Sequence, residues 1–140
     1  LLLDMDHFKA VNDEYGHDIG DKVLKELSRI LNETLRESDV IIRYGGEEFI
    51  VLLVNIKTEE DALNVANKIR EKVKENEIDV YAGSKLRKTI SIGLSMFPHD
   101  SSNFDSVIKN ADIALYEAKS KGRDQVVRFT PESISSVDIF

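Results

Sequence analysis

The 140-residue sequence contains no cysteine, which removes disulfide frameworks and thiolate metal sites from consideration. It also lacks an excess of positive charge: the formal net charge is −7, whereas nonspecific binders of nucleic acid or acidic membranes need a cationic field. The apolar run at residues 1–3 is far too short for a signal peptide or a membrane span. We therefore expect a cytoplasmic domain that binds no nucleic acid and does not insert into a membrane. A small phosphate ligand is compatible with this charge if a divalent metal and a few Lys or Arg side chains hold it.

The residues that are present give the composition of an ordinary globular protein, with 41% hydrophobic and 32% charged side chains and no low-complexity tract. A chain of this length is expected to form one domain around a single core. Apolar residues recur three or four positions apart in three segments, which we predict to be helices over residues 18–36, 59–75 and 104–120. Thr58 is the expected N-cap of the second helix, and Gly122 is the expected C-cap glycine of the third.

Runs rich in β-branched and aromatic residues predict strands at residues 1–5, 40–54, 87–97 and 126–129, with a hairpin inside the second run. Asn, Gly and Asp interrupt residues 6–18, which are expected to form a loop, and residues 130–140 are expected to be a weakly structured tail. The order β-α-β-β-α-β, followed by a helix and a strand, is typical of an α+β ferredoxin-like split βαβ fold with a central antiparallel sheet and flanking helices. In this topology the first strand lies beside the hairpin.

Two adjacent glycines, Gly45 and Gly46, lie between a strand-like run and two acids, Glu47 and Glu48. Such a pair supplies the positive φ angles of a two-residue hairpin turn, so the acids are expected at the hairpin tip. Asp4 ends the first strand, which is expected beside the hairpin, so Asp4 and Glu47 can share a divalent cation. The alternative is that these acids are solvated loop residues, but acids clustered on neighbouring strand ends repel each other unless a cation lies between them.

The segment Gly-Gly-Glu-Glu-Phe at residues 45–49, with residues 3–9 upstream, resembles the GGDEF family of diguanylate cyclases in its GGEEF variant. The similarity extends through residues 12–13, 16–21, 89–93 and 111–123, and covers roughly residues 1–129. It implies a palm-like architecture shared with nucleotidyl cyclases and polymerases. It further implies condensation of two GTP into cyclic di-GMP and two pyrophosphates across a homodimer, regulated by an N-terminal sensor or signalling domain. The resemblance also implies that the family's usual N-terminal helix and lead-in would precede the first strand, which opens this sequence.

For the metal site, the resemblance implies that Asp4, the backbone carbonyl of Met5, and Glu47 bind two Mg²⁺ (or Mn²⁺) ions per GTP. Two such ions would hold the attacking and leaving oxygens of a phosphoryl transfer. Glu48 would lie beside them, either assisting the metal site or deprotonating the 3′-hydroxyl of GTP. The division of roles between Glu47 and Glu48 stays open.

For the phosphates, the resemblance implies that the amides of Phe8 and Lys9 hold the β and γ groups, with the Lys9 side chain near the transition state. Lys119 and Arg123 are expected one helical turn apart at the end of the third helix, where both can point at one anion. Their alternative role is a favourable interaction with the C-terminal end of that helix.

For the base, the resemblance implies that Asn12 and Asp21 select guanine, that Leu24 packs on the ring and that His17 lies in the same pocket. A carboxylate matches the donor edge of guanine at N1 and N2, and an amide matches its acceptors. Taken singly, Asn12 is also an ordinary turn residue, Asp21 an ordinary acid in a first helical turn, and His17 a residue that could simply be solvated.

Arg36 and Asp39 form an RxxD pair at the offset of the family's product-inhibition motif, which implies that cyclic di-GMP binds here as an inhibitor. Arg36 would present its planar fork to a phosphate or to the Hoogsteen edge of guanine. Lys68 would assist where the family often has arginine, although lysine loses the bidentate contact.

Two other functions remain open from the sequence. A catalytically inactive module that binds GTP or cyclic di-GMP and regulates a partner domain would keep Arg36 and Asp39 but would usually alter the acids, and Asp4, Glu47 and Glu48 are all present here. A scaffold without enzymatic activity would leave the acidic hairpin unexplained.

Overall fold

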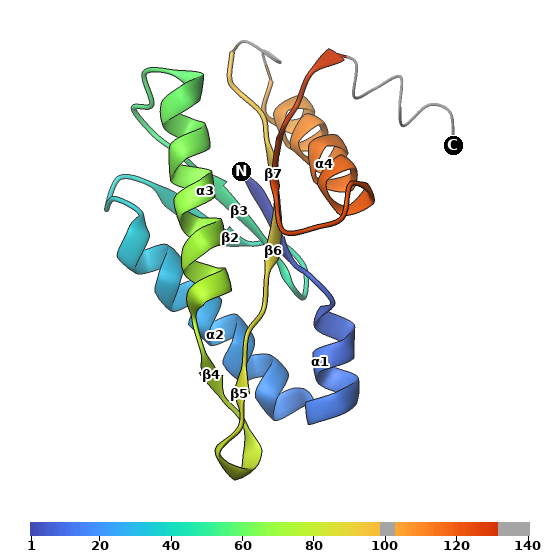
Figure 1. The fold of residues 1–140 in the computed structure, drawn as a ribbon. Helices are drawn as coiled ribbons and strands as arrows, with labels where there is room; N and C mark the ends of the chain where they lie inside the picture. Colours follow the sequence, from blue (N-terminus) through green and yellow to red (C-terminus); the bar gives the residue numbers. More distant parts are fainter. Residues whose placement is uncertain (99–102, 132–140) are drawn as a thin grey trace.

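A computed structural model of the protein describes residues 1–98 and 103–131. In these two ranges a mixed sheet is flanked by helices (Figure 1). The elements, in chain order, are β1 (Leu2–Met5), α1 (Phe8–Tyr15), α2 (His17–Thr34), β2 (Val40–Arg43), β3 (Glu48–Leu52), α3 (Glu59–Glu75), β4 (Ile78–Asp79), the 3₁₀ turn η1 (Tyr81–Gly83), β5 (Lys85–Leu86), β6 (Ile90–Leu94), α4 (Phe104–Ser120) and β7 (Val126–Arg128).

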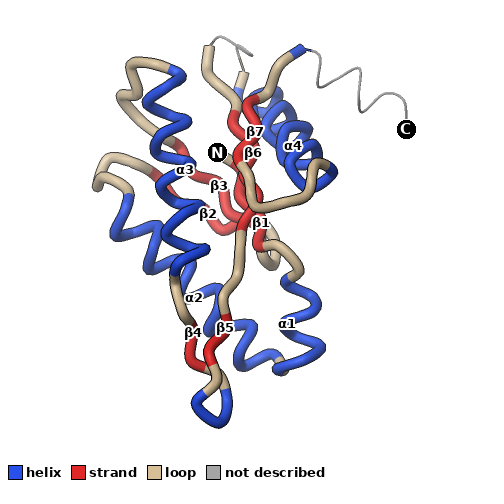
Figure 2. The backbone as a smooth tube through the Cα atoms, viewed as in Figure 1, coloured by secondary structure: helices blue, strands red, loops and turns tan. Residues whose placement is uncertain are grey.

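The main sheet has the strand order β2-β3-β1-β6-β7. β1 pairs antiparallel with both β3 and β6, and β7 adds parallel to β6. The first strand therefore lies directly beside the hairpin, which confirms the expected α+β ferredoxin-like fold. β4 and β5 form a separate two-stranded ribbon, at the same end of the molecule as α1 (Figure 2).

The two faces of the sheet meet different helices because side chains alternate along each strand. Leu3 and Met5 belong to the large core that includes residues of α2 and α3, whereas Leu2 packs with Ile50 and residues of α4. Figure 1 shows α3 and α4 on opposite sides of β6. Asp4 lies two residues after Leu2 in the same strand, so its side chain is directed toward the α4 face.

Gly93 allows α4 to approach the sheet closely. A Cβ atom at this position would lie 2.1 Å from the carbonyl oxygen of Ala111 and 2.5 Å from the backbone nitrogen of Leu115. The backbone of α4 thus rests on the backbone of β6, as expected for a glycine inside a strand. This contact sets the height of α4 above the sheet, and with it the position of Lys119 near the end of the helix.

The expected loop over residues 6–18 is wrong, because most of this segment is helical. α1 spans Phe8–Tyr15, and Gly16, with φ of 90°, separates it from α2. Phe8 and Val11 are buried and Tyr15 packs against the same core. Burial of these apolar residues, spaced three and four positions apart, outweighs the weak helix propensity of the Asn and Asp between them.

The hairpin tip also differs from the expected two-residue turn. The backbone N–H of Tyr44 donates to the carbonyl oxygen of Glu48 at 2.7 Å, which closes a loop over residues 45–47. Only Gly45 of the glycine pair has a positive φ, at 86°.

The strand expected over residues 87–97 is shorter in the structure. β6 covers only Ile90–Leu94, and the residues just before the expected strand, 85–86, pair with β4 in the separate ribbon.

The remaining elements agree with expectation. Thr58 caps α3 by accepting a hydrogen bond from the backbone N–H of Asp61 at 3.1 Å, and α4 runs to Ser120 with Gly122 at φ of 116° just beyond it. The expected weakly structured tail falls mostly on residues 132–140, outside the described residues. Among the helices that the structure describes, none combines the length and apolar character needed to cross a membrane.

Candidate active site

Carboxylates from β1 and the β2–β3 hairpin gather on the α4 face of the sheet. Asp4 and Glu48 are directly opposed across the antiparallel pair of β1 and β3, an arrangement that puts two side chains on one face and close together. Glu47 precedes Glu48 at the hairpin tip. From α4, the Nζ atom of Lys119 lies 3.3 Å from Oδ2 of Asp4. The sheet therefore brings the acids together opposite one cation.

Burial raises the pKa of Asp4, and the nearby charges of Glu47 and Asp6 raise it further, while Lys119 acts in the opposite direction. Burial also raises the pKa of Glu48, with further contributions from the charges of Asp4, Asp112 and Glu47. The carboxylates of Asp4, Glu47 and Glu48 therefore outnumber the single ammonium group of Lys119 at this place. An additional cation at this place would relieve the repulsion.

The residues fit a divalent metal ion that substrate would help to hold. Oδ1 of Asp4 is buried and has no hydrogen-bond partner among the described residues, so one strong acceptor is unused. In the same residues, no group of three or more acidic or histidine side chains is arranged to hold a metal by itself. Mg²⁺ is commonly bound by one or two carboxylates plus substrate phosphates and water, and this donor set suits that mode.

The N-terminus of α1 is directly connected to the end of β1. His7 precedes the helix in a left-handed conformation, with φ of 54°, and its side chain makes no capping hydrogen bond. The first amides of α1, which include those of Phe8 and Lys9, therefore have no capping side chain, and the helix dipole makes this end favourable for an anion. The Lys9 side chain is exposed beside them.

Arg123 does not lie on the helix that carries Lys119, so the expected spacing of one helical turn is wrong. α4 ends at Ser120, and Arg123 follows in a turn with φ of 65°. Its backbone N–H donates to the carbonyl oxygen of Ala118 at 3.0 Å, while its Nε is buried without a partner among the described residues. Lys119 makes its ion pairs with Asp4 and, at 3.8 Å, with Asp6.

The residues expected to bind guanine lie on α1 and α2. Asp21 and Leu24 line a pocket of about 280 Å³ together with Arg43, Phe49 and two residues of α2, Lys25 and Ser28. Asn12 of α1 packs against α2: a Cβ atom at Gly20 would lie 1.9 Å from its Oδ1. Gly20 therefore leaves the space that the Asn12 side chain occupies. His17 is exposed as the first residue of α2.

The RxxD pair forms a closed turn. The backbone N–H of Arg36 donates to Oδ2 of Asp39 at 3.0 Å, and Oδ1 of Asp39 accepts from the backbone N–H of Val54 at 3.0 Å. The Arg36 side chain is exposed, and both residues line a pocket of about 170 Å³. No hydrogen bond or ion pair joins Lys68 to either residue in the described part of the chain, and Lys68 is exposed on α3.

Sequence reasoning missed the residues that surround Asp6. Asp6 is 1% exposed and accepts hydrogen bonds from the hydroxyls of Thr89 and Ser91, each at 2.7 Å. Asp124, after α4, was also not identified, and neither was Asp112, whose charge acts on Glu48. The alternation of Leu2, Asp4 and Asp6 on one face of the first strand is the signal that could have placed Asp6 inward.

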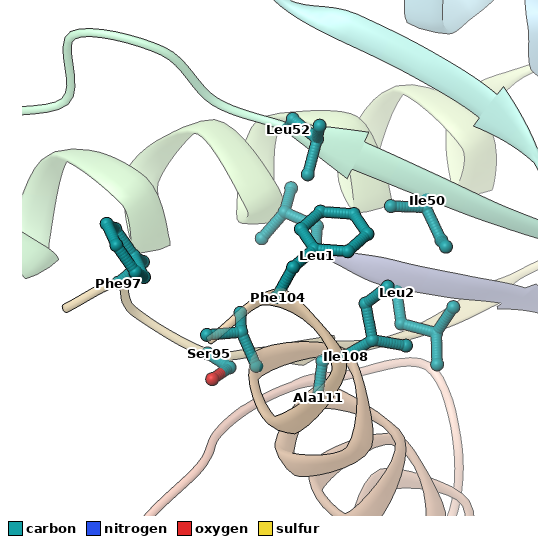
Figure 3. Close-up of a pocket in the computed structure, with 10 residues that line it drawn as sticks. Leu1, Leu2, Ile50, Leu52, Ser95, Phe97, Phe104, Ile108 and Ala111 are labelled. Carbon is teal, nitrogen blue, oxygen red and sulfur yellow. The ribbon is translucent and has the colours of Figure 1, made fainter. Parts of the chain in front are cut away.

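An apolar pocket of about 450 Å³, separate from the two described above, lies near the start of β1 (Figure 3). Leu2, Ile50 and Leu52 from the sheet and Phe104 and Ile108 from α4 are among the residues that line it. Its lining contains no charged side chain, so it is unsuited to a triphosphate.

The fold is that of a cyclase palm domain, as comparisons with known proteins show. The family model described as "Diguanylate cyclase, GGDEF domain" matches residues 1–125. Diguanylate cyclase A of Treponema denticola is 46% identical over 126 residues, which make up 90% of this chain and 33% of that protein. This chain spans about a third of the length of the curated relatives it matches.

Two solved structures extend the similarity. The isolated GGDEF domain of YfiN (TpbB) from Pseudomonas aeruginosa has a TM-score of 0.94 at 31% identity, over 98% of this chain and 79% of that one. The active GGEEF domain of a diguanylate cyclase from Vibrio cholerae has a TM-score of 0.83 at 31% identity, over 92% of this chain and 80% of that one. The chain belongs to the GGDEF domain family, which confirms the resemblance stated from the sequence.

Proposed function

We propose that this domain is a diguanylate cyclase, which condenses two GTP into cyclic di-GMP and releases two pyrophosphates. The observation that carries the proposal is the gathering of Asp4, Glu47 and Glu48 opposite Lys119, with an unpartnered buried oxygen on Asp4. The similarity to an active GGEEF domain supports it. Because the acids of the family motif are present, we prefer this function to that of an inactive module that only binds GTP or cyclic di-GMP.

In the proposed mechanism, Asn12 and Asp21 orient guanine, Leu24 packs on the ring, and His17 would approach the same ligand. The amides of Phe8 and Lys9, at the N-terminus of α1, and the cations of Lys119 and Arg123 hold the triphosphate. Asp4, the carbonyl of Met5, and Glu47 would hold two Mg²⁺ (or Mn²⁺) ions. When bound, such ions neutralise phosphate charge and lower the pKa of the attacking hydroxyl.

Glu48 is the proposed general base. Its raised pKa makes its carboxylate a better proton acceptor than an ordinary glutamate. The 3′-oxygen of one GTP forms a bond to the α-phosphorus of the other, the bond from that phosphorus to pyrophosphate breaks, and the hydroxyl proton passes to Glu48. Lys9 would lie beside the phosphates, where its charge would stabilise the transition state.

The reaction requires two such domains. Each bound GTP supplies one 3′-hydroxyl and one α-phosphate, so the cyclic product forms when two domains hold their substrates face to face. We therefore propose a homodimer whose assembly an N-terminal sensor or signalling domain of the full-length protein controls, in the cytoplasm, where GTP is available.

Incubation of the purified protein with GTP and Mg²⁺, followed by mass analysis of the products, tests the function. We expect cyclic di-GMP and pyrophosphate from the wild type, and a loss of turnover of about 100-fold or more in Glu48→Gln, because the amide cannot accept the proton. Glu75→Gln is the matched control, since Glu75 is exposed at the end of α3 and should tolerate the change. Absence of cyclic di-GMP in the wild type with GTP bound would favour the inactive module. Normal turnover in Glu48→Gln would remove Glu48 from the mechanism.

Feedback inhibition by cyclic di-GMP is a second expected property. The exposed guanidinium of Arg36, presented by the turn that Asp39 closes, would bind the product, with Lys68 contributing a charge from α3. Arg36→Ala is expected to raise the inhibition constant of cyclic di-GMP about tenfold or more, a loss typical of a bidentate charged contact, with little change in initial rate. Arg36→Lys keeps the charge without the planar fork and should show partial inhibition.

Asp39 is unsuitable for this test, because its carboxylate holds the backbone of Val54 and its loss would disturb the turn itself. Equal product inhibition of the wild type and Arg36→Ala would show that the RxxD segment only ends a helix.

A further inference from the structure

Asp6 is a buried acid that the proposed mechanism does not use. It follows β1, is 1% exposed, and its own backbone N–H donates to the carbonyl oxygen of Thr89 at 2.9 Å. Its Oδ1 accepts from the hydroxyl of Ser91, and its Oδ2 accepts from the hydroxyl of Thr89 and, at 3.0 Å, from the backbone N–H of Asp124. Three segments far apart in the sequence therefore meet at one carboxylate.

The partners of Asp6 are all hydrogen-bond donors. With Lys119 at 3.8 Å from Oδ1, the acceptor positions of both oxygens are directed at protein groups. This sets Asp6 apart from Asp4, whose Oδ1 has no partner in the described residues. Asp6 is thus engaged with the protein, whereas Asp4 is available to a ligand.

One of these contacts holds an unusual turn between α4 and β7. Gly122, Arg123 and Asp124 all have positive φ, at 116°, 65° and 47°. Left-handed backbone at two consecutive residues other than glycine persists only where surrounding contacts fix it. Here Asp6 holds the backbone N–H of Asp124 from inside.

The side chain of Asp124 fixes the same turn from outside. Its Oδ1 lies 3.0 Å from Nη1 of Arg70, and its Oδ2 lies 2.8 Å from Nζ of Lys74, both on α3. The turn is therefore held between the end of β1 and the surface of α3. The contact from Asp6 and the contacts from α3 all act on Asp124, the residue that directly follows Arg123.

Arg123 owes its position to this turn. Its backbone N–H is bound to Ala118, but its Nε is buried without a partner in the part of the chain that the structure describes. The main chain therefore sets where the guanidinium is presented. Lys119, the other cation assigned to the phosphates, is within 3.8 Å of Asp6 as well.

We propose that Asp6 is a positioning residue for the triphosphate: its carboxylate fixes the turn at residues 122–124 and so places Arg123, together with Lys119, at the phosphates, without itself binding metal or substrate. This inference rests on the proposed function, because it assumes that GTP occupies the site. Asp6, directly after β1, would thus have a different role from that of Asp4 within the strand.

The test compares the binding of GTP and GMP, measured by calorimetry with the full chain in saturating Mg²⁺. Asp6→Asn keeps the size of the side chain but has one acceptor oxygen and directs N–H groups at donors, so the turn should lose its inner contact. We expect its affinity for GTP to fall about tenfold or more, as for other residues that orient ligand-binding groups, and its affinity for GMP to change less than about twofold. GMP uses the guanine pocket but lacks the β and γ phosphates.

Ser91→Ala is the control for a purely structural effect. It removes a hydrogen bond to the same carboxylate, on Oδ1, and leaves the contact between Oδ2 and Asp124 in place. It should lower thermal stability, as Asp6→Asn should, but keep the wild-type ratio of GTP to GMP affinity. A ratio that falls equally in both variants, or in neither, would overturn the inference.

A titration of Mg²⁺ separates positioning from metal binding. If Asp6 acts through the turn, the lost GTP affinity of Asp6→Asn persists at saturating Mg²⁺; recovery of that affinity by added Mg²⁺ would make Asp6 a ligand and overturn the proposal. Failure of the wild type to bind GTP at all would instead refute the proposed function, an outcome that is distinguishable from the others.

Discussion

Asp4→Asn is expected to abolish formation of cyclic di-GMP while leaving the free energy of unfolding unchanged or higher. The buried Asp4 carboxylate is the acid proposed to hold metal from the central strand, and metal ions supply several kcal/mol of charge stabilisation in phosphoryl transfer. Its loss should lower turnover about 1000-fold or more, since each 1.36 kcal/mol corresponds to a factor of ten.

The stability half of this prediction follows from the raised pKa of Asp4. The pKa is raised because burial and the charges of Glu47 and Asp6 disfavour the ionised form more than Lys119 favours it. At neutral pH the ionised Asp4 therefore contributes unfavourably to folding, and the neutral amide removes that contribution. Buried charges that lower the stability of the fold are typical of metal and catalytic centres.

The pH dependence gives a further check on the same variant. Asp4 and Glu48 have ordinary pKa values of 3.8 and 4.5, and both are raised in the folded protein. As the pH falls through the raised values, the folded state takes up protons before the unfolded chain does, so these two groups add stability in that window. The stability difference between the wild type and Asp4→Asn should therefore shrink as the pH falls, while Mg²⁺-dependent turnover of the wild type is lost.

Urea unfolding at several pH values measures the stability of Asp4→Asn, and product analysis with GTP and Mg²⁺ measures its turnover. Asp105→Asn is the matched control, because Asp105 is exposed in the first turn of α4, far along the helix from Lys119, and should keep full activity. Retention of cyclase activity by Asp4→Asn would remove Asp4 from the site. A large loss of stability at neutral pH would show that the carboxylate is structural.

The central part of the fold was predictable because local patterns and topology agree there. The apolar strand at residues 1–5, the glycine pair and the ferredoxin-like order together predict that Asp4 lies beside the acids of the hairpin, and β1 does pair with β3 there. The cap of α3 at Thr58 and the end of α4 at Ser120 followed from short-range chemistry alone. Where the expectation failed, at α1, polar residues in the segment hid the apolar spacing of Phe8, Val11 and Tyr15.

The contacts around Asp6 were not predictable from local patterns. Its partners Thr89, Ser91 and Asp124 lie 83, 85 and 118 residues away in the sequence, and no local spacing indicates that they meet. The prediction for Arg123 is wrong for a related reason: it applied helical spacing to a residue beyond the end of α4 at Ser120, where three residues with positive φ turn the chain away. The contacts of Asp6 and the position of Arg123 both depend on tertiary contacts, which hold the turn at residues 122–124 in a conformation that is unfavourable for its residues in isolation.

Gly93→Ala is expected to destabilise the protein by about 3 kcal/mol or more, at or above the upper end of the usual cost of overpacking. The added methyl group would lie 2.1 Å from the carbonyl oxygen of Ala111 and 2.5 Å from the nitrogen of Leu115, and neither backbone atom can rotate away as a side-chain tip could. The only relief is a shift of α4 away from β6. Because α4 carries Lys119, the same shift should weaken GTP binding.

Gly46→Ala is the matched control for this loss of stability. A Cβ atom at Gly46 would meet nothing within 4 Å, and its φ lies outside the left-handed region, so the change should alter stability by less than about 0.5 kcal/mol. Urea unfolding of the two variants measures the contrast. If Gly93→Ala were as stable as Gly46→Ala, α4 would be free to rise from the sheet without cost, and the position of Lys119 opposite Asp4 could not be attributed to close backbone packing at Gly93.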